Sequence, residues 1–315
     1  MSCYIGLDTS NYTTSAAAFD AATGALWQVK QLLPVEEGKM GLRQSDAVFH
    51  HTKQLPVLLE QLFPTLSSSV EAVGVSTRPM EEDGSYMPCF LAGTGTARSL
   101  AAAFGKPLYR FTHQQGHVMA VLYGAGKVAL RKKPLLAFHV SGGTTEALLV
   151  RPSEETVITC SCVARSRDLK AGQLIDRVGG MLGMPFPAGP MLDNLSQRSV
   201  GDMRLPRPTV SGADCHLSGV ENQCRRMLEQ GAPREDVARF CLLSIQAALT
   251  HMTEQLLLQY GDLPVVYAGG VMSNTLLQKA LGERFGGVFA PAEYSADNAV
   301  GIAVLTTLRA GGTLS

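Results

Sequence analysis

The sequence predicts a duplicated α/β protein with two lobes and a cleft between them. Its 315 residues correspond to about two domains, at roughly 150 residues per domain. Residues 4–19 and 135–150 share one layout, in which an apolar strand enters a turn of small polar residues and a second strand returns. A further apolar strand, residues 265–268, ends in two glycines before a predicted helix. On pattern alone, an ordinary doubly wound α/β protein without duplication is the alternative.

The first half of the chain reads as an antiparallel meander followed by helices and strands in alternation. Polar residues separate the first two apolar strands, and a second turn leads into the third. Apolar residues at helical spacing after Ser45, a candidate N-cap, predict the first helix. The expected strands are residues 4–8, 15–19, 26–30 and 72–75, and the expected helices are residues 45–63 and 93–104.

The second half restarts the same plan. Of the 32 glycines, many follow apolar runs in pairs or triplets, which is typical of tight turns at strand ends. The expected elements are strands at 135–140 and 146–150 and helices from about 274 and over 299–308. The terminal helix is free to pack back on the first lobe. The predicted lobes are residues 1–112 and 113–315.

Composition and charge exclude several classes of protein. Hydrophobic residues make up 45% and charged residues 17%, which excludes a disordered chain and a coiled coil. Lys plus Arg equals Asp plus Glu at 27 each, so any RNA contact must be local or shared with a partner. The seven cysteines include no C-x-x-C pair, and no apolar run reaches about 18 residues. We therefore expect reduced thiols, no membrane span and a cytoplasmic protein.

Two histidines at helical spacing form a candidate metal site. Thr112 is a suitable N-cap, and a helix that starts there puts His113 and His117 on one face. Two imidazoles at this spacing can bind one metal ion, although surface or capping histidines would give the same pattern. The sequence lacks H-E-x-x-H, so a third ligand must come from elsewhere. Asp297, just before the last apolar helix, is the best candidate, and its alternative role is a helix cap.

Three glycine-rich turns are candidates for phosphate binding. Backbone N–H groups of such turns can approach an anion, and Ser or Thr hydroxyls add donors, but each turn could also be purely structural. The three turns are residues 141–145, 183–190 and 269–274. No complete P-loop, dinucleotide fingerprint or G-x-S-x-G elbow occurs in the sequence. The sequence therefore contains none of these other nucleotide-binding or hydrolase motifs that would compete with the three turns as the binding site.

Taken in order, the motifs resemble those of one family, the TsaD-type tRNA threonylcarbamoyltransferases, formerly called O-sialoglycoprotein endopeptidases or glycoproteases. The resemblance covers nearly the whole chain. The matching motifs are H-x-x-x-H at His113 and His117, S-G-G at Ser141–Gly143, G-x-x-x-D at Gly172–Asp176, the Pro- and Gly-rich loop at Pro187–Pro190, F-S-G at Leu217–Gly219, G-G-V-x-x-N at Gly269–Asn274 and D-N-A at Asp297–Ala299. This family belongs to the actin-like ATPase superfamily, so the resemblance implies a duplicated, ribonuclease H-like, two-lobed fold.

The resemblance also implies an activity, cofactors and binding residues. The implied reaction transfers threonylcarbamoyl from threonylcarbamoyl-AMP to the N(6) amine of an adenosine in tRNA. Family members work with partner subunits, so tRNA, protein partners and a homo- or heterodimer are expected. One divalent metal, iron or zinc, is expected on His113, His117 and Asp297. An adenine nucleotide, as ATP, AMP or the acyl-adenylate, is expected on His139, Val140, Ser141, Gly142, Gly143, Asp176, Gly189 and Asn274.

Departures from the family pattern lie in the half that would face the acceptor. The family's E-T-S-C-D-E-T begins at Asp8 here, and its two later acids are Tyr12 and Thr13. No catalytic acid or base is therefore assigned. The acids that could replace the missing pair are Glu81, Glu82, Asp83 and Glu146. The alternatives are a paralogue that binds an adenine nucleotide and transfers a carbamoyl or phosphoryl group to another acceptor, and a weakly catalytic partner subunit. A protease is excluded, since no nucleophile or metalloprotease signature occurs.

Overall fold

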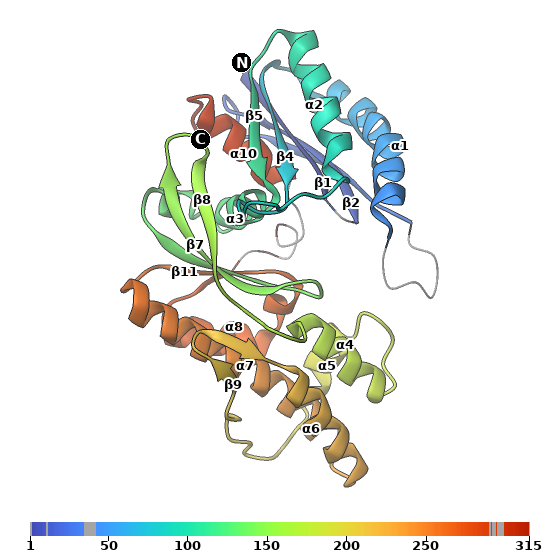
Figure 1. Ribbon diagram of the computed structural model, residues 1–315, viewed down its shortest axis with the longest axis vertical. Helices are drawn as coiled ribbons and strands as arrows, with labels where there is room; N and C mark the ends of the chain where they lie inside the picture. Colours follow the sequence, from blue (N-terminus) through green and yellow to red (C-terminus); the bar gives the residue numbers. More distant parts are fainter. Residues whose placement is uncertain are drawn as a thin grey trace. The chain divides into compact units, whose positions relative to one another are not determined.

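The computed structural model describes residues 2–10, 12–34, 42–289, 291, 294 and 299–314. The chain forms two compact units, whose ribbons are drawn in Figure 1. Unit 1 comprises Met1–Lys133, Arg151–Ser161 and Glu293–Ser315, and unit 2 comprises Pro134–Val150 and Cys162–Ala292. The first boundary therefore lies after Lys133 and differs from the expected boundary at 112/113. Along the described residues, no helix is both long and apolar enough to cross a membrane.

Unit 1 is built on a five-stranded mixed sheet. Its strands are β1 (Ser2–Ser10), β2 (Thr13–Asp20), β3 (Leu26–Leu32), β4 (Ser69–Arg78) and β5 (Leu108–Thr112). They lie in the order β3-β2-β1-β4-β5. β1, β2 and β3 form an antiparallel meander, whereas β4 and β5 continue the sheet parallel to β1. The four strands predicted in this half are confirmed, and β5 had no counterpart among them.

Helices cover both faces of this sheet. They are α1 (Gln44–Leu62), α2 (Phe90–Phe104), α3 (His113–Gly124) and α10 (Ala299–Arg309). α1 and α2 lie side by side (Figure 1) and cover the face that carries Ile5 and Leu7 of β1. Because strand side chains alternate, Gly6 faces the other side, where α10 packs. The expected N-cap Ser45 was wrong, since Arg43 holds that position and Ser45 lies in the first turn.

Unit 2 repeats the same sheet. The strands of this sheet are β6 (Leu135–Val140), β7 (Thr145–Ser153), β8 (Val157–Arg165), β11 (Val265–Ala268) and β12 (Val288–Phe289). The end of β7 and the start of β8, within Arg151–Ser161, are counted with unit 1. β6 and β7 are antiparallel, and β11 runs parallel to both β6 and β12. The order β8-β7-β6-β11-β12 matches β3-β2-β1-β4-β5 strand for strand. The predicted duplication is therefore confirmed at the level of topology. A separate two-stranded sheet joins β9 (Thr209–Ser211) and β10 (Asp214–His216).

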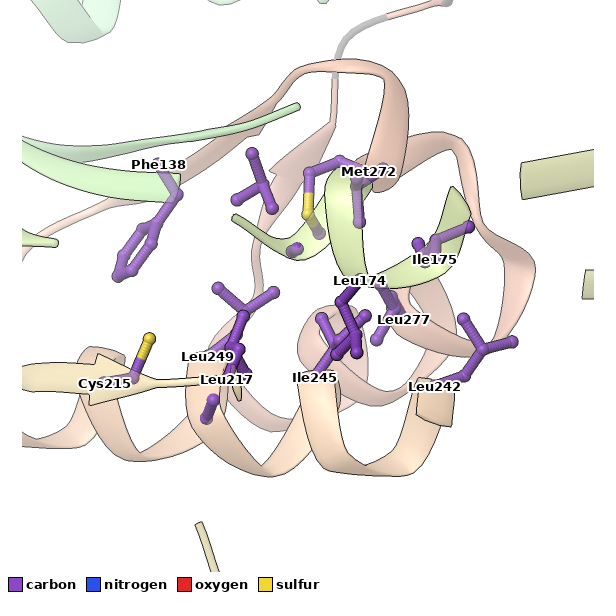
Figure 2. Close-up of a cluster of buried hydrophobic side chains, with 14 of the residues drawn as sticks. Phe138, Leu174, Ile175, Cys215, Leu217, Leu242, Ile245, Leu249, Met272 and Leu277 are labelled. Atoms are coloured by element: carbon purple, nitrogen blue, oxygen red, sulfur yellow. The ribbon is translucent and has the colours of Figure 1, made fainter. Parts of the chain in front are cut away.

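The core of unit 2 fixes the start of its first helix against the sheet. The helices are α4 (Ala171–Met181), α5 (Gly189–Ser196), α6 (Ser218–Glu229), α7 (Arg234–Tyr260) and α8 (Thr275–Phe285). Figure 2 shows buried side chains that meet in this core, among them Phe138 of β6, Leu174 of α4 and Ile245 of α7. Each such side chain contributes roughly 1.5–3 kcal/mol on burial. α4 is therefore held firmly beside the turn that follows β6.

Candidate active site

Asp8 lies near the carboxyl end of β1, on the face of the sheet opposite α1 and α2. It is 1% exposed, and its two oxygens have four polar neighbours. Oδ2 accepts from Ser10 Oγ at 2.6 Å and from Ser10 N at 3.3 Å. Oδ1 accepts from Ser76 Oγ and lies 3.0 Å from His113 Nδ1. The carboxylate is therefore held from its own strand, from β4 and from α3.

The environment of Asp8 favours its ionised form. Burial raises the pKa of this carboxyl group, but the imidazole of His113 and the hydroxyls of Ser10 and Ser76 lower it by more. The pKa therefore lies below its ordinary value. A carboxylate in this state is an acceptor that keeps its charge at neutral pH.

α3 brings the two predicted histidines together. Thr112 Oγ1 accepts from Gln115 N at 3.2 Å, and Gln115 Oε1 accepts from Thr112 N at 2.6 Å. This reciprocal pair is a capping box, and it starts the helix at His113. The rings of His113 and His117 follow one turn apart, with centroids 4.4 Å apart and planes at 71°. The predicted cap and the shared face of the histidines are confirmed.

α10 approaches α3 and β1 at glycines. A Cβ on Gly301 would lie 1.8 Å from the carbonyl oxygen of Gly116, which stands between the two histidines on α3. A Cβ on Gly6 of β1 would lie 2.3 Å from a backbone nitrogen of α10. Neither position has room for a side chain, so the backbone of α10 crosses α3 at the histidine turn. α10 begins at Ala299, two residues after Asp297.

The third predicted metal ligand, Asp297, lies outside the described residues. Among the residues that are described, no group of three or more His, Cys, Asp or Glu side chains is arranged to hold a metal ion. The two described donors still fit a divalent transition metal, because adjacent imidazoles suit zinc and iron. Because α10 crosses α3 at Gly301, two residues after its start, the first turn of α10 packs against the turn of α3 that carries the histidines.

In unit 2, the turn after β6 is held by its own serine and by the start of α4. Ser141 Oγ accepts the N–H groups of Gly143 at 3.3 Å and Thr144 at 3.2 Å, and Ser141 O accepts from Gly172 N at 3.1 Å. A Cβ on Gly172 would lie 2.6 Å from Gly142 N, so the turn packs directly on α4. Gly142 and Gly143 themselves are exposed. The backbone of the turn is therefore accessible to an anionic ligand.

The predicted residues just before this turn have different environments. His139 is half-buried and pairs with Glu146 on one side and Ala268 on the other. Val140 is fully buried in the core, so it can offer a ligand only backbone atoms. A Cβ on Gly269, whose φ is 98°, would lie 2.2 Å from Val140 O. The turns after β6 and β11 therefore lie side by side, as expected for neighbouring parallel strands.

A cavity of about 290 Å³ joins two of the predicted nucleotide-binding motifs. Its lining includes Gly189 at the start of α5 and Asn274 before α8, with Ile175 and Gly270. Asn274 Oδ1 accepts from the N–H of Leu277 at 3.1 Å, so this side chain caps α8. A cavity of this size is at the small end of the range for ligand pockets, about 300–1,000 Å³.

Two acids organise the surroundings of this cavity. Asp176 Oδ1 accepts from Ala188 N at 2.9 Å and fixes the loop that leads into α5. Asp193 lines the cavity, and its Oδ2 accepts from Thr275 N at 3.2 Å. Sequence reasoning missed Asp193, although its position four residues after Gly189 places both on one face of a helix.

Of the positions that depart from the family pattern, Tyr12 lies just before β2 and Thr13 is its first residue. Tyr12 is 38% exposed, and its carbonyl oxygen accepts from Leu33 N at 2.8 Å. Among the acids considered as replacements, Glu81 lies in unit 1, where its Oε1 accepts from Gln115 Nε2 at 2.8 Å and from Cys160 N at 3.0 Å. Burial raises the pKa of Glu81 above its ordinary value, although these donors and a nearby arginine oppose that effect. Glu81 also lines a cavity of about 550 Å³.

Two units of one strand topology form a duplicated α/β fold, and solved structures share it. Component A of (R)-2-hydroxyglutaryl-CoA dehydratase from Acidaminococcus fermentans matches 99% of this chain and 100% of that chain, with a TM-score of 0.54 and 14% identity. The ROK hexokinase of Thermus thermophilus matches 97% and 99%, with a TM-score of 0.52 and 18% identity. HypF in its phosphate- and nucleotide-bound form matches 99% of this chain and 56% of that chain, with a TM-score of 0.63 and 11% identity. The chain therefore has this two-unit α/β fold.

Sequence comparison identifies the particular family. The model of the family TsaD, tRNA N6-adenosine threonylcarbamoyltransferase, matches residues 37–304, and the chain belongs to this family. The tRNA N6-adenosine threonylcarbamoyltransferase of Geobacillus kaustophilus is 29% identical over 323 residues, which cover 96% of this chain and 90% of that protein. The protein of the same name from Bacillus licheniformis is 28% identical and covers 96% and 91%. The resemblance predicted from the motifs is confirmed.

Proposed function

We propose that this chain transfers the threonylcarbamoyl group from threonylcarbamoyl-AMP to the N(6) amine of an adenosine in tRNA. Family membership carries the proposal, because the match extends over residues 37–304 and relatives named for this activity align with 96% of the chain. The chain has no net charge to attract RNA, so tRNA binding is expected to need a partner subunit.

The adenylate is proposed to bind unit 2 on the residues that the motifs indicate. The exposed turn at Gly142 and Gly143 suits the phosphate, because glycine lets a ligand approach the backbone closely. Asp176 uses one carboxylate oxygen for Ala188 N, and its second oxygen suits a ribose hydroxyl. Gly189 and Asn274 line the cavity between α5 and α8. His139 and Val140 end the strand that leads into the phosphate turn.

Unit 1 is proposed to hold one divalent cation, iron or zinc, on His113, His117 and Asp297. Two imidazoles and a carboxylate suit these metals better than magnesium. A bound cation would supply Lewis-acid chemistry that polarises the acyl oxygen. The chain itself aligns the two imidazoles on consecutive turns of α3, and Gly301 lets α10 pack closely against that helix.

Positioning is expected to contribute to the rate, because the N(6) amine of adenine is a weak nucleophile. A site that holds amine and acyl carbon together supplies an effective concentration that solution cannot. Backbone donors at the turn after β6 would stabilise charge on the departing adenylate. The N(6)–C bond forms as the C–O bond to the phosphate breaks, so that the amine loses one proton to solvent and AMP is the leaving group.

A second candidate function is transfer to a different acceptor. The replacement of two acids of the family pattern by Tyr12 and Thr13 favours it, since these positions lie where the chain passes from β1 into β2. In that case the nucleotide residues of unit 2 keep their role and the acceptor is not tRNA.

The deciding experiment supplies labelled threonylcarbamoyl-AMP and unmodified tRNA to the purified protein, with and without candidate partner subunits. Label on tRNA, lost in a His113→Ala variant, is the expected result. Tight binding of the adenylate without any transfer to tRNA would favour the second candidate. Failure to bind either the adenylate or AMP would refute both, and calorimetric titration with AMP measures this directly.

A further inference from the structure

We propose that Asp8 is the positioning residue of His113. Its Oδ1 accepts a hydrogen bond from the Nδ1–H of the imidazole, so that Nε2 carries the lone pair that binds a cation. The inference rests on the proposed metal centre of unit 1 and adds to it a residue that is not one of the three ligands. Its starting observation is the 3.0 Å contact between His113 Nδ1 and Asp8 Oδ1.

The hydrogen bonds around Asp8 determine which ring nitrogen carries the proton. Ser10 gives the carboxylate a hydroxyl and a backbone N–H, and Ser76 gives it a second hydroxyl. An ionised carboxylate only accepts, so a fourth neighbour at 3.0 Å must be a donor. Nδ1 of His113 is therefore the protonated nitrogen. In the neutral ring, the unprotonated nitrogen is then Nε2, and only an unprotonated nitrogen can ligate a metal.

The position of Asp8 is set by the sheet rather than by a flexible loop. Leu7 of β1 pairs with Val75 of β4, so Asp8 and Ser76 are the next residues along two hydrogen-bonded strands. Asp8 is 1% exposed and Ser76 is fully buried, so water does not compete for the carboxylate. A carboxylate fixed in this way restricts the rotation of the imidazole about its Cβ–Cγ bond. Such outer carboxylates orient metal-binding histidines and raise their basicity.

A role as proton acceptor in the reaction fits Asp8 less well. Both oxygens already accept hydrogen bonds, and the group lies beneath the histidine rather than on the surface of unit 1. The family pattern has glutamate at this position, and the shorter Asp8 still contacts His113. A carboxylate, and not a particular side-chain length, is therefore the feature that the inference requires.

The first test reads the tautomer directly and needs neither metal nor tRNA. Long-range ¹H–¹⁵N correlation spectra of the full chain labelled at histidine nitrogen distinguish protonated from bare ring nitrogens, and a His113→Gln spectrum assigns the signals. The expected result for the metal-free protein is a protonated Nδ1 and a bare Nε2. A protonated Nε2 with a bare Nδ1 would overturn the proposal, whatever the activity of the protein.

The second test measures affinity for Zn²⁺ by competition with a chromophoric chelator. We expect Asp8→Asn to weaken binding by about 10- to 100-fold, the usual effect of losing an outer carboxylate. Asp8→Glu should restore most of the affinity, because it returns the charge and the acceptor.

Asp20→Asn is the matched control, since it removes another carboxylate of unit 1 that is 1% exposed. Asp20 accepts from Ala22 N at 2.8 Å, Thr23 N at 3.2 Å and Ser68 Oγ, and it pairs with Cys3 at the far end of β1 from Asp8. A purely structural role for Asp8 would make the two Asn variants equally weak in zinc binding, and that result would overturn the proposal.

The outcomes separate this inference from the proposed function. If wild-type protein binds no Zn²⁺, Fe²⁺ or Co²⁺, the proposed metal centre fails and the positioning role fails with it. If the metal binds and Asp8→Asn binds it equally well, only the positioning role fails. If Asp8→Asn does not fold, the wild-type tautomer and the Asp8→Glu affinity still decide the question.

Discussion

Gly301→Ala tests the contact that joins α10 to the histidine turn of α3. The new Cβ would lie 1.8 Å from Gly116 O and 2.8 Å from Ala120 N, whereas ordinary contacts begin near 3.4 Å. The two helices would have to separate by about 1.6 Å, which puts the cost at the upper end of the overpacking range, about 3 kcal/mol. Helix propensity favours Ala over Gly by about 1 kcal/mol. The net expectation is a loss of about 2 kcal/mol in the free energy of unfolding.

The matched control is Gly95→Ala in α2. Gly95 is exposed on a helix, and a Cβ there would have open space within 4 Å among the described atoms. Only the propensity term remains, so this variant should be more stable by up to about 1 kcal/mol. The chain's single tryptophan, Trp27, lies on β3 and packs against the core of unit 1. Its fluorescence in a urea titration therefore follows the unfolding of the unit that contains both substitutions.

The prediction is a difference of about 3 kcal/mol, of opposite sign for the same chemical change. Equal midpoints for Gly301→Ala and Gly95→Ala, or a Gly301→Ala variant more stable than wild type, would refute the close crossing of α3 and α10. A Gly301→Ala variant that keeps zinc affinity despite its lower stability would show that the crossing serves folding alone.

Three further expectations concern a buried hydroxyl pair, a buried imidazole and an open turn. Thr253→Val should lower the free energy of unfolding by about 1–3 kcal/mol, because the buried Tyr267 hydroxyl would lose its hydrogen bond to Thr253 Oγ1, 2.9 Å away. Adding Tyr267→Phe should recover part of this loss, and additive losses in urea titrations would contradict the pairing. Burial lowers the pKa of His51 from 6.5 to about 4, so the unfolded chain takes up a proton below pH 6.5 that the folded chain refuses until about pH 4. Stability is thus lost as pH falls through that window, by up to roughly 3 kcal/mol. In urea titrations at pH 7 and pH 4.5, His51→Gln should reduce the difference in the free energy of unfolding between the two pH values, and an unchanged difference would contradict this expectation. Gly142→Ala should leave stability within about 0.5 kcal/mol but weaken AMP binding in calorimetry, and unchanged affinity would count against a phosphate at this turn.

The strands and their duplication were readable from the sequence because their signals are local. Apolar strands and small polar turns at 4–19 and 135–150 predict the same hairpin twice, and both hairpins form. The capping box at Thr112 is local in the same sense, and it starts α3 where expected. Signals of this kind depend on a few neighbouring residues, so one sequence is enough to detect them.

The extent of unit 1 was not readable, because long-range packing sets it. α3 belongs to unit 1 through contacts with α10, at glycines 185 positions apart in the chain, Gly116 and Gly301. No local pattern relates these positions. Asp8 was read only as the end of a strand, since its link to His113 spans 105 residues. The link between Asp193 and Thr275 was missed for the same reason, because the two residues lie 82 positions apart.

The glycines of this chain divide into those that the fold explains and those that it does not. At Gly6 and Gly301 a side chain would clash with the backbone of a neighbouring element, and Gly269 combines such a contact with a φ of 98°. Gly142 and Gly143 have neither a positive φ nor, among the described atoms, any neighbour within 4 Å of a Cβ. Nothing in the described fold requires glycine there, and these two positions leave room for a ligand that approaches from outside. An open glycine turn beside the start of α4 fits the anion that we propose for it.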